Sequence, residues 1–268
     1  MTTLQTVFAT AKAANRAALV GYLPAGFPSK EGAVAAAAAL VEAGCDVIEI
    51  GLPYSDPLMD GPTIQDAVHR SLLNGTRIAD VLRTVEGVAA TGAATLVMTY
   101  WNPIDRYGAE RFARDLAAAG GVGTITPDLT PEESEPWRAA SAAAGIDTVF
   151  LVAPSSTEAR IKAVVDCCTG FVYAASLMGV TGARETVNVA AEDLVKRTRA
   201  HTALPVCVGL GVGTGKQAAE VAGYADGVIV GSAFIRRMLD APDEAAGRES
   251  IAVLAREMAE GVRARARA

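Results

Sequence analysis

Short apolar runs rich in β-branched residues alternate eight times with alanine-rich stretches along this chain. The runs expected to form strands are Ala18–Leu23, Val47–Gly51, Thr95–Thr99, Gly123–Thr126, Thr148–Val152, Phe171–Ala174, Val206–Gly209 and Gly227–Val230. The stretches expected to form helices are Glu31–Ala43, Ile78–Ala90, Ala109–Ala119, Pro131–Ala144, Glu158–Cys167, Ala190–Ala200, Lys216–Ala222 and Ala245–Ala264. Because the strands are apolar almost throughout, they should be buried on both faces and pair in parallel. The alternation predicts an α/β fold, a single (β/α)8 TIM barrel domain over residues 1–268 with an extra N-terminal helix.

Composition agrees with a large hydrophobic core and argues against several other classes of protein. The chain is 51% hydrophobic and 20% charged, unlike a disordered protein, and its net charge of −6 disfavours binding to nucleic acid or to anionic membranes. No run approaches about 18 consecutive apolar residues, so no membrane span is predicted. The cysteines, Cys45, Cys167, Cys168 and Cys207, lack metal-ligand spacing and are expected to be buried reduced thiols of a cytoplasmic protein.

Glycines follow the last two predicted strands. Gly211 and Gly213 come after the seventh strand, and Gly231-Ser232 opens a helix that begins near Ala233. Backbone N–H groups and the positive end of a helix dipole at these loops would suit an anion, and barrel enzymes often hold a substrate phosphate there. Ordinary turn glycines are the alternative. The spacing fits neither a dinucleotide fingerprint nor a P-loop.

Glu49 is the only charged residue of the second predicted strand. It shares a strand face with Val47 and Gly51, so it should point into the mouth of the barrel. Partial desolvation there would raise its pKa toward a value useful for general acid–base catalysis, whereas an ion pair with an arginine would make it structural. The chain has two histidines, both away from the strand ends, so carboxylates should carry any proton chemistry.

Asp60 lies in the proline-containing loop that follows the same strand. Capping and catalysis are about equally supported for it, because Thr63 and Asp66 resemble a capping box at the start of the next helix. Tyr173, at the end of the sixth strand, could hydrogen-bond a substrate or simply fill the mouth. The residues alone thus indicate a barrel that binds a phosphorylated substrate and uses carboxylates for acid–base chemistry.

These residues also resemble one family. Ile48–Gln65 is similar to the signature of the tryptophan synthase α subunit, and the similarity continues in register through Met98–Pro103, Pro127–Leu129, Ser176–Gly182, Gly209–Gly211 and Gly231–Ala233. It covers essentially the whole chain. The resemblance implies the retro-aldol cleavage of indole-3-glycerol phosphate to indole and glyceraldehyde 3-phosphate, a step of tryptophan biosynthesis.

The resemblance also implies roles for individual residues. Glu49 would move the protons, and Asp60 would accept the indole N–H, which favours catalysis over capping for Asp60. The residues that bind the substrate phosphate would be Gly182, Gly211, Gly231 and Ser232. The indole pocket would include Tyr22, Tyr100 and Leu210, and Tyr173 would be an active-site tyrosine. Thr181 would belong to a mobile lid from Met178 to about Thr186.

Finally, the resemblance implies a partner, a pyridoxal-phosphate β subunit in an α2β2 complex, with no cofactor or metal in this chain. The contact surface would be the catalytic mouth, including Pro53, Asp56, Pro57 and the Tyr100–Pro103 loop, where the bulky Trp101 departs from the family pattern. Alternatives are a stand-alone lyase, a subunit that mainly activates its partner allosterically, and a different phosphate-binding barrel. The pair of carboxylates argues against a purely regulatory subunit, and the lack of a lysine or cysteine at a strand end argues against a different barrel enzyme.

Overall fold

The computed structural model describes residues 2–175, 184–209 and 211–264. Its strands are β1 (Ala18–Pro24), β2 (Val47–Gly51), β3 (Ala94–Met98), β4 (Gly123–Ile125), β5 (Asp147–Val149), β6 (Leu151–Val152), β7 (Val172–Ala175), β8 (Val206–Gly209) and β9 (Gly227–Val230). Neighbouring strands pair in parallel, in the order β5-β4-β3-β2-β1-β9-β8-β7-β6. The predicted parallel barrel is confirmed, since the two ends of this sheet are consecutive in the chain.

The fifth predicted strand is split into β5 and β6 at Phe150. Its first part pairs with β4 and its second part with β7. The backbone N–H of Phe150 points to the sulfur of Cys168 at 3.4 Å instead of to a carbonyl, while its carbonyl accepts from the N–H of Tyr173. The strand is therefore interrupted because the Phe150 N–H donates to a thiol where a strand would donate to a backbone carbonyl. The barrel still closes, since the segments on both sides of Phe150 pair with neighbouring strands.

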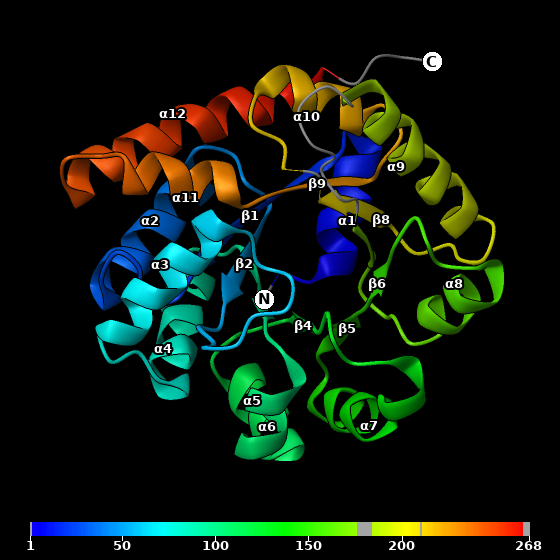
Figure 1. Cartoon of the computed structure of the whole chain (residues 1–268), viewed down its shortest axis with the longest axis horizontal. Coiled ribbons are helices and arrows are strands. Elements are labelled where there is room, and N and C mark those ends of the chain that lie inside the picture. The colour runs from blue at the N-terminus through cyan, green and yellow to red at the C-terminus, as the bar shows by residue number, and fades with distance from the viewer. Residues whose placement is uncertain (1, 176–183, 210, 265–268) are drawn as a thin grey trace.

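Helices surround the strands, as Figure 1 shows. They are α1 (Leu4–Ala13), α2 (Lys30–Glu42), α3 (Pro62–Leu73), α4 (Ile78–Ala89), α5 (Trp101–Tyr107), α6 (Ala109–Ala118), the 3-10 turn η1 (Pro131–Glu133), α7 (Glu135–Ala144), α8 (Glu158–Val165), α9 (Arg184–Arg199), α10 (Gly215–Ala222), α11 (Ser232–Leu239) and α12 (Glu244–Arg263). The sequence did not predict α5, it merged η1 with α7, and it placed the start of α9 too late. The other predicted helices are present within a few residues.

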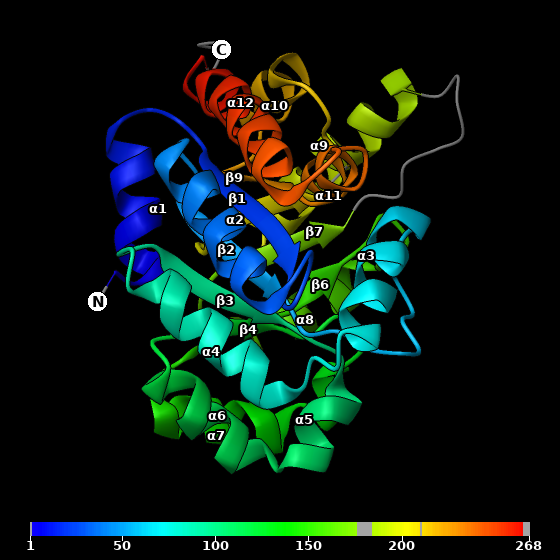
Figure 2. The same cartoon turned by 90° about the vertical axis from the view of Figure 1, so that its left-hand side faces the viewer.

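The interior of the barrel has its own hydrophobic cluster, and side chains of α1 belong to it. Inward side chains of the strands, among them Val20 and Val47, pack with Leu4, Val7 and Phe8 of α1. The rings of Phe8 and Phe171 meet edge to face, with 5.7 Å between their centroids. Figure 2 shows α1 at the end of the barrel opposite to α3. The helix thus seals the amino-terminal ends of the strands and leaves their carboxyl-terminal ends as the open mouth.

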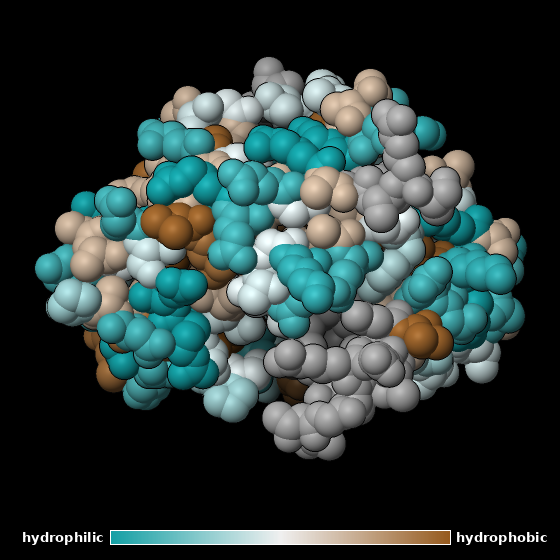
Figure 3. Space-filling view, turned by 90° about the horizontal axis from the view of Figure 1, so that it is seen from above, coloured by the Kyte–Doolittle hydropathy of each residue, from teal (hydrophilic) through white to brown (hydrophobic). Residues whose placement is uncertain are grey.

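A larger cluster joins the outer faces of the strands to the surrounding helices, with Ile48 and Ile50 of β2 among its members. All four cysteines are buried and free, as predicted. In Figure 3 hydrophilic side chains cover much of one outer face, with isolated hydrophobic residues between them. Within the described residues, no helix is both long enough and apolar enough to cross a membrane.

Candidate active site

Glu49 lies inside the barrel, as its place in the strand predicts. Its neighbour Val47 belongs to the interior cluster, whereas Ile48 and Ile50 belong to the outer one. The side chain is 3% exposed, and its Oε2 atom has no hydrogen-bond partner. Burial first, and the charge of Asp60 second, raise the pKa of Glu49 to about 8. An arginine partner was the structural alternative, but none of the ion pairs among the described residues includes Glu49. Glu49 is therefore a buried carboxyl that holds its proton at neutral pH.

Asp60 lies half-buried in the loop between β2 and α3. It is not a helix cap, because the N-cap residue of α3 is Gly61 and no side chain caps that end. The predicted capping box is wrong: Asp66 pairs with Arg70 along the helix at 3.1 Å. Burial raises the pKa of Asp60, and a hydrogen bond from the Tyr100 hydroxyl works against that rise. The carboxylate of Asp60 is thus free of a structural role in the helix that follows it.

Tyr100 holds the loop that carries Asp60. Its hydroxyl accepts the backbone N–H of Met59 at 3.0 Å, in addition to its hydrogen bond with Asp60. The ring of Tyr54 lies against the Tyr100 ring, with 5.4 Å between centroids. Tyr100 is 2% exposed and follows β3, so a neighbouring strand fixes the position of the loop. The sequence suggested a pocket wall here, and nothing in the spacing indicated the contact with the loop.

Two further tyrosines reach over glycines at the mouth. A Cβ added to Gly51 would lie 2.3 Å from the hydroxyl oxygen of Tyr22. Likewise, a Cβ added to Gly209 would lie 2.2 Å from the hydroxyl oxygen of Tyr173. Any larger residue at either glycine would displace a tyrosine. Each glycine ends the strand next to the one that carries its tyrosine. The strand-end glycines therefore make room for hydroxyl groups above the buried Glu49.

The start of α11 offers unpaired backbone donors near the last strand. Gly231 is its N-cap residue and Ser232 its first residue, and no side-chain cap occupies that end. The start of α10 differs, because Thr214 caps it and the N–H of Gly213 already donates to the Gln217 side chain at 2.8 Å. Gly211, with a φ of +62°, adopts the left-handed conformation that favours glycine. Of the two loops, the start of α11 is the better prepared for an anion.

Asp128, which follows β4, holds the start of α5. Its two carboxylate oxygens accept from the N–H of Trp101 at 2.9 and 3.1 Å. The Trp101 ring packs against Trp137, with 6.3 Å between centroids, which accounts for a bulky residue in this loop. Thr181, Gly182 and Leu210 lie outside the described residues, as does most of the predicted lid. Nothing in the sequence indicated this contact of Asp128.

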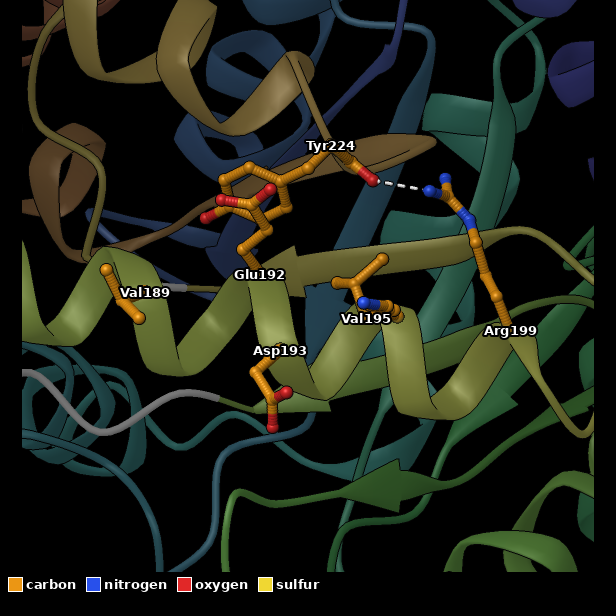
Figure 4. A pocket seen from close by; sticks show the side chains of 7 residues that line it. Val189, Glu192, Asp193, Val195, Arg199 and Tyr224 are labelled. Atoms are coloured by element: carbon orange, nitrogen blue, oxygen red, sulfur yellow. Dashed lines mark hydrogen bonds between the residues drawn. The ribbon is translucent and has the colours of Figure 1, made fainter.

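A separate hollow of about 430 Å³ lies on the outside of the barrel, between α9 and the residue Tyr224. Figure 4 shows Glu192 beside the ring of Tyr224, and Arg199 donating to the Tyr224 backbone carbonyl. No residue predicted for catalysis or substrate binding lines this hollow. The mouth of the barrel, with Glu49 and Asp60, is therefore the candidate active site.

Comparison with known proteins decides the family. A family model described as tryptophan synthase alpha chain matches residues 8–263. The chain belongs to this family. It is 60% identical to the tryptophan synthase alpha chain of Thermobifida fusca over 100% of both chains, and 60% identical to that of Streptomyces coelicolor over 98% of this chain and 97% of the other. A chain in the structure of Mycobacterium tuberculosis tryptophan synthase in space group F222 has a TM-score of 0.90 and 54% identity, covering 97% of this chain and 98% of that one.

A more distant member of the family keeps the same fold. The alpha subunit of tryptophan synthase from Legionella pneumophila has a TM-score of 0.89 at 32% identity, with 98% of each chain covered. The family, the barrel fold, and the assignment to a lyase of tryptophan biosynthesis are thereby confirmed. The roles of individual residues are not part of that confirmation and rest on the geometry of the mouth.

Proposed function

We propose that this chain cleaves indole-3-glycerol phosphate to indole and glyceraldehyde 3-phosphate with Glu49 and Asp60 as its catalytic residues. The observation that carries this assignment is a buried carboxyl with a pKa near 8 beside a second, half-buried carboxyl. At neutral pH the first carboxyl can act as an acid, and the proposal assigns the anionic role to the second. The proposed reaction needs that division of roles.

In this proposal, Glu49 gives its proton to C3 of the indole ring and becomes a carboxylate. Asp60 accepts the indole N–H and stabilises the positive charge that develops on the nitrogen. The C3–C3′ bond then breaks, and its electrons neutralise the ring. The C3′ hydroxyl becomes the aldehyde as Glu49 takes up its proton, so the carboxyl ends the cycle protonated, as it began.

The rest of the substrate would occupy the groups around the two carboxyls. The phosphate would bind the open start of α11 at Gly231 and Ser232, with Gly211 and, outside the described residues, Gly182. The indole ring would lie among Tyr22, Tyr100 and Tyr173, together with Leu210. Thr181 would act from the lid.

The proposal includes no cofactor bound to this chain. Within the described residues, no group of three or more His, Cys, Asp or Glu side chains is arranged to hold a metal ion. Cleavage should accordingly continue after dialysis against a chelator. Loss of activity that added metal restores would contradict this part of the proposal.

We further propose that a pyridoxal-phosphate β subunit binds the mouth and receives the indole, in a cytoplasmic α2β2 complex. Support comes from two hydrophobic residues exposed in the Asp60 loop, Leu58 at 75% and Met59 at 50%. Asp56 and Asn102 are also exposed there, whereas Pro53 and Pro103, which were predicted contacts, are buried within this chain. Burial of an exposed apolar loop would stabilise a complex.

Leu58→Ser tests this contact surface. It should weaken binding of a matched β subunit, measured by isothermal titration calorimetry, by about tenfold or more. Leu73→Ser is the matched control, because Leu73 is 73% exposed at the far end of α3. Equal losses in both variants would contradict the proposed surface.

The activity itself is tested by indole release from indole-3-glycerol phosphate, with and without the matched β subunit. Slow release that rises sharply with the partner would support a subunit of a bienzyme complex, and fast release alone would indicate a stand-alone lyase. Glu49→Gln and Asp60→Asn should each abolish release in both conditions. Absence of indole from the wild-type chain in both conditions would exclude the proposed activity.

A further inference from the structure

The first turn of α3 holds the backbone of Asp60. The side-chain Nε2 atom of Gln65, the fourth residue of this helix, donates to the backbone carbonyl of Asp60 at 2.7 Å. The backbone N–H of Gln65 donates to the carbonyl of Gly61 at 3.0 Å. The position of Asp60 therefore depends on where the first turn of α3 lies, in addition to the hydrogen bond between Tyr100 and the backbone of Met59.

Packing around this part of the chain is sparse. Leu58 and Met59, just before Asp60, are 75% and 50% exposed, and a Cβ added to Gly61 would meet no described atom within 4 Å. The fully buried residues of α3 begin only with its sixth residue, Ala67. Packing thus anchors the second half of the helix, whereas individual side-chain contacts determine the position of its first turn.

Arg236 of α11 makes such a contact. Its Nη2 atom donates to the hydroxyl of Thr63, the second residue of α3, at 2.5 Å. The two helices lie side by side in Figures 1 and 2. None of the ion pairs among the described residues includes Arg236, so no carboxylate there competes with Thr63 for the guanidinium. A cationic donor also makes a stronger hydrogen bond than a neutral one.

The other end of this connection is the proposed phosphate site. Ser232 is the first residue of α11 and Arg236 is the fifth, so the two lie one turn apart on the same side of the helix. Arg236 consequently joins the helix whose start would bind the phosphate to the helix whose first turn holds Asp60. A direct connection between two sites would fix the distance at which one substrate meets both.

We propose that Arg236 is a positioning residue that, through Thr63, holds Asp60 at the distance from the phosphate site that the substrate requires. The proposal rests on the proposed function, because Asp60 and the phosphate site would bind two parts of one substrate. The alternative is that Arg236 attracts the phosphate directly, as a cation one turn from Ser232. The two roles differ in whether Thr63 is needed.

Arg236→Met and Thr63→Val each remove the contact, and both side chains are at least partly exposed, so the variants should fold. Each should lower kcat for indole release by about threefold to tenfold with little change in KM, because a misplaced Asp60 stabilises the transition state less well. Arg236→Lys keeps a cationic donor and should recover part of the loss. Arg237→Met is the matched control, since the Arg237 side chain, next along α11, makes no hydrogen bond or ion pair within the described residues.

The double variant Arg236→Met/Thr63→Val decides between the two roles. If the contact carries the effect, the double variant should be no slower than either single variant. An Arg236→Met loss that persists undiminished in the Thr63→Val background, or one that appears in KM alone, would overturn the proposal in favour of direct attraction of the phosphate. Unchanged kcat in both single variants would also overturn it.

Hydrogen exchange measured by NMR gives a readout that needs no substrate. The Gln65 N–H, which donates to Gly61, should exchange at least about threefold faster in Arg236→Met and in Thr63→Val than in the wild type or in Arg237→Met. Unchanged exchange would overturn the link between α11 and α3, whatever the activity. If the wild-type chain releases no indole while exchange responds as expected, the proposed function fails and the link between the helices is still established.

Discussion

At the scale of single residues, burial gives each carboxyl at the mouth its chemical character. Glu49 is in a strand whose other inward neighbours are apolar or glycine, so water does not stabilise its charge. Asp60 is half-buried and receives a hydrogen bond from Tyr100. The two carboxyls therefore have different surroundings, and in the proposed reaction Glu49 transfers protons while Asp60 accepts a hydrogen bond.

The raised pKa of Glu49 predicts how stability depends on pH. Between the ordinary carboxyl range and about pH 8, the folded protein keeps a proton on Glu49 that the unfolded chain releases. The free energy of unfolding should therefore fall as pH rises through that range, by a few kcal/mol at most. Glu49→Gln should remove most of this fall. Urea unfolding of both proteins at about pH 6 and about pH 9 measures it, and parallel pH dependence in the two would contradict the expected burial cost.

Tyr100→Phe tests whether one hydroxyl positions the Asp60 loop. The variant loses the acceptor for the Met59 N–H and the donor to Asp60, so kcat/KM for indole release should fall by about tenfold or more. Tyr54→Phe loses only a hydroxyl that accepts from Asn102 at 3.2 Å, and should have a smaller effect. Equal activity in Tyr100→Phe and the wild type would show that the loop needs no such support.

At the scale of elements, the sequence predicted the strands well because their apolar runs have to be buried on both faces. It did not predict the break at Phe150, which depends on the sulfur of Cys168, a contact between segments distant in the chain. Nor did it predict α5, a short helix with Pro103 in its third position. The roles of Tyr100 and Asp128 were missed for the same reason, because each acts through a contact with another strand's loop.

Asp128 supplies a prediction about α5. Asp128→Ala removes the acceptor of the Trp101 N–H and should lower the free energy of unfolding by about 1–2 kcal/mol. Asp128→Asn keeps one carbonyl oxygen and should recover most of the loss. Trp101 packs on Trp137, so tryptophan fluorescence would report any loosening of the helix start. An Asp128→Ala protein with unchanged stability would mean that water replaces the carboxylate without cost.

At the scale of the whole molecule, α1 joins the barrel interior to the amino-terminal end of the chain. Phe8 is 6% exposed and meets Phe171 inside the barrel. Phe8→Ala should therefore cost about 3–5 kcal/mol of stability. Since we propose that residues 1–268 form one domain, unfolding should remain a single transition at a lower urea concentration. Two separate transitions would contradict that proposal, and kcat should change little because the mouth lies at the other end.

The position of α1 also bears on how the protein could be handled. Because α1 seals the end of the barrel away from α3, the start of the chain faces away from the mouth, as Figure 2 shows. A chain attached to a solid support through that end would present its mouth outward. A sensor surface or flow reactor built this way would give substrate, and any partner that binds there, unobstructed access.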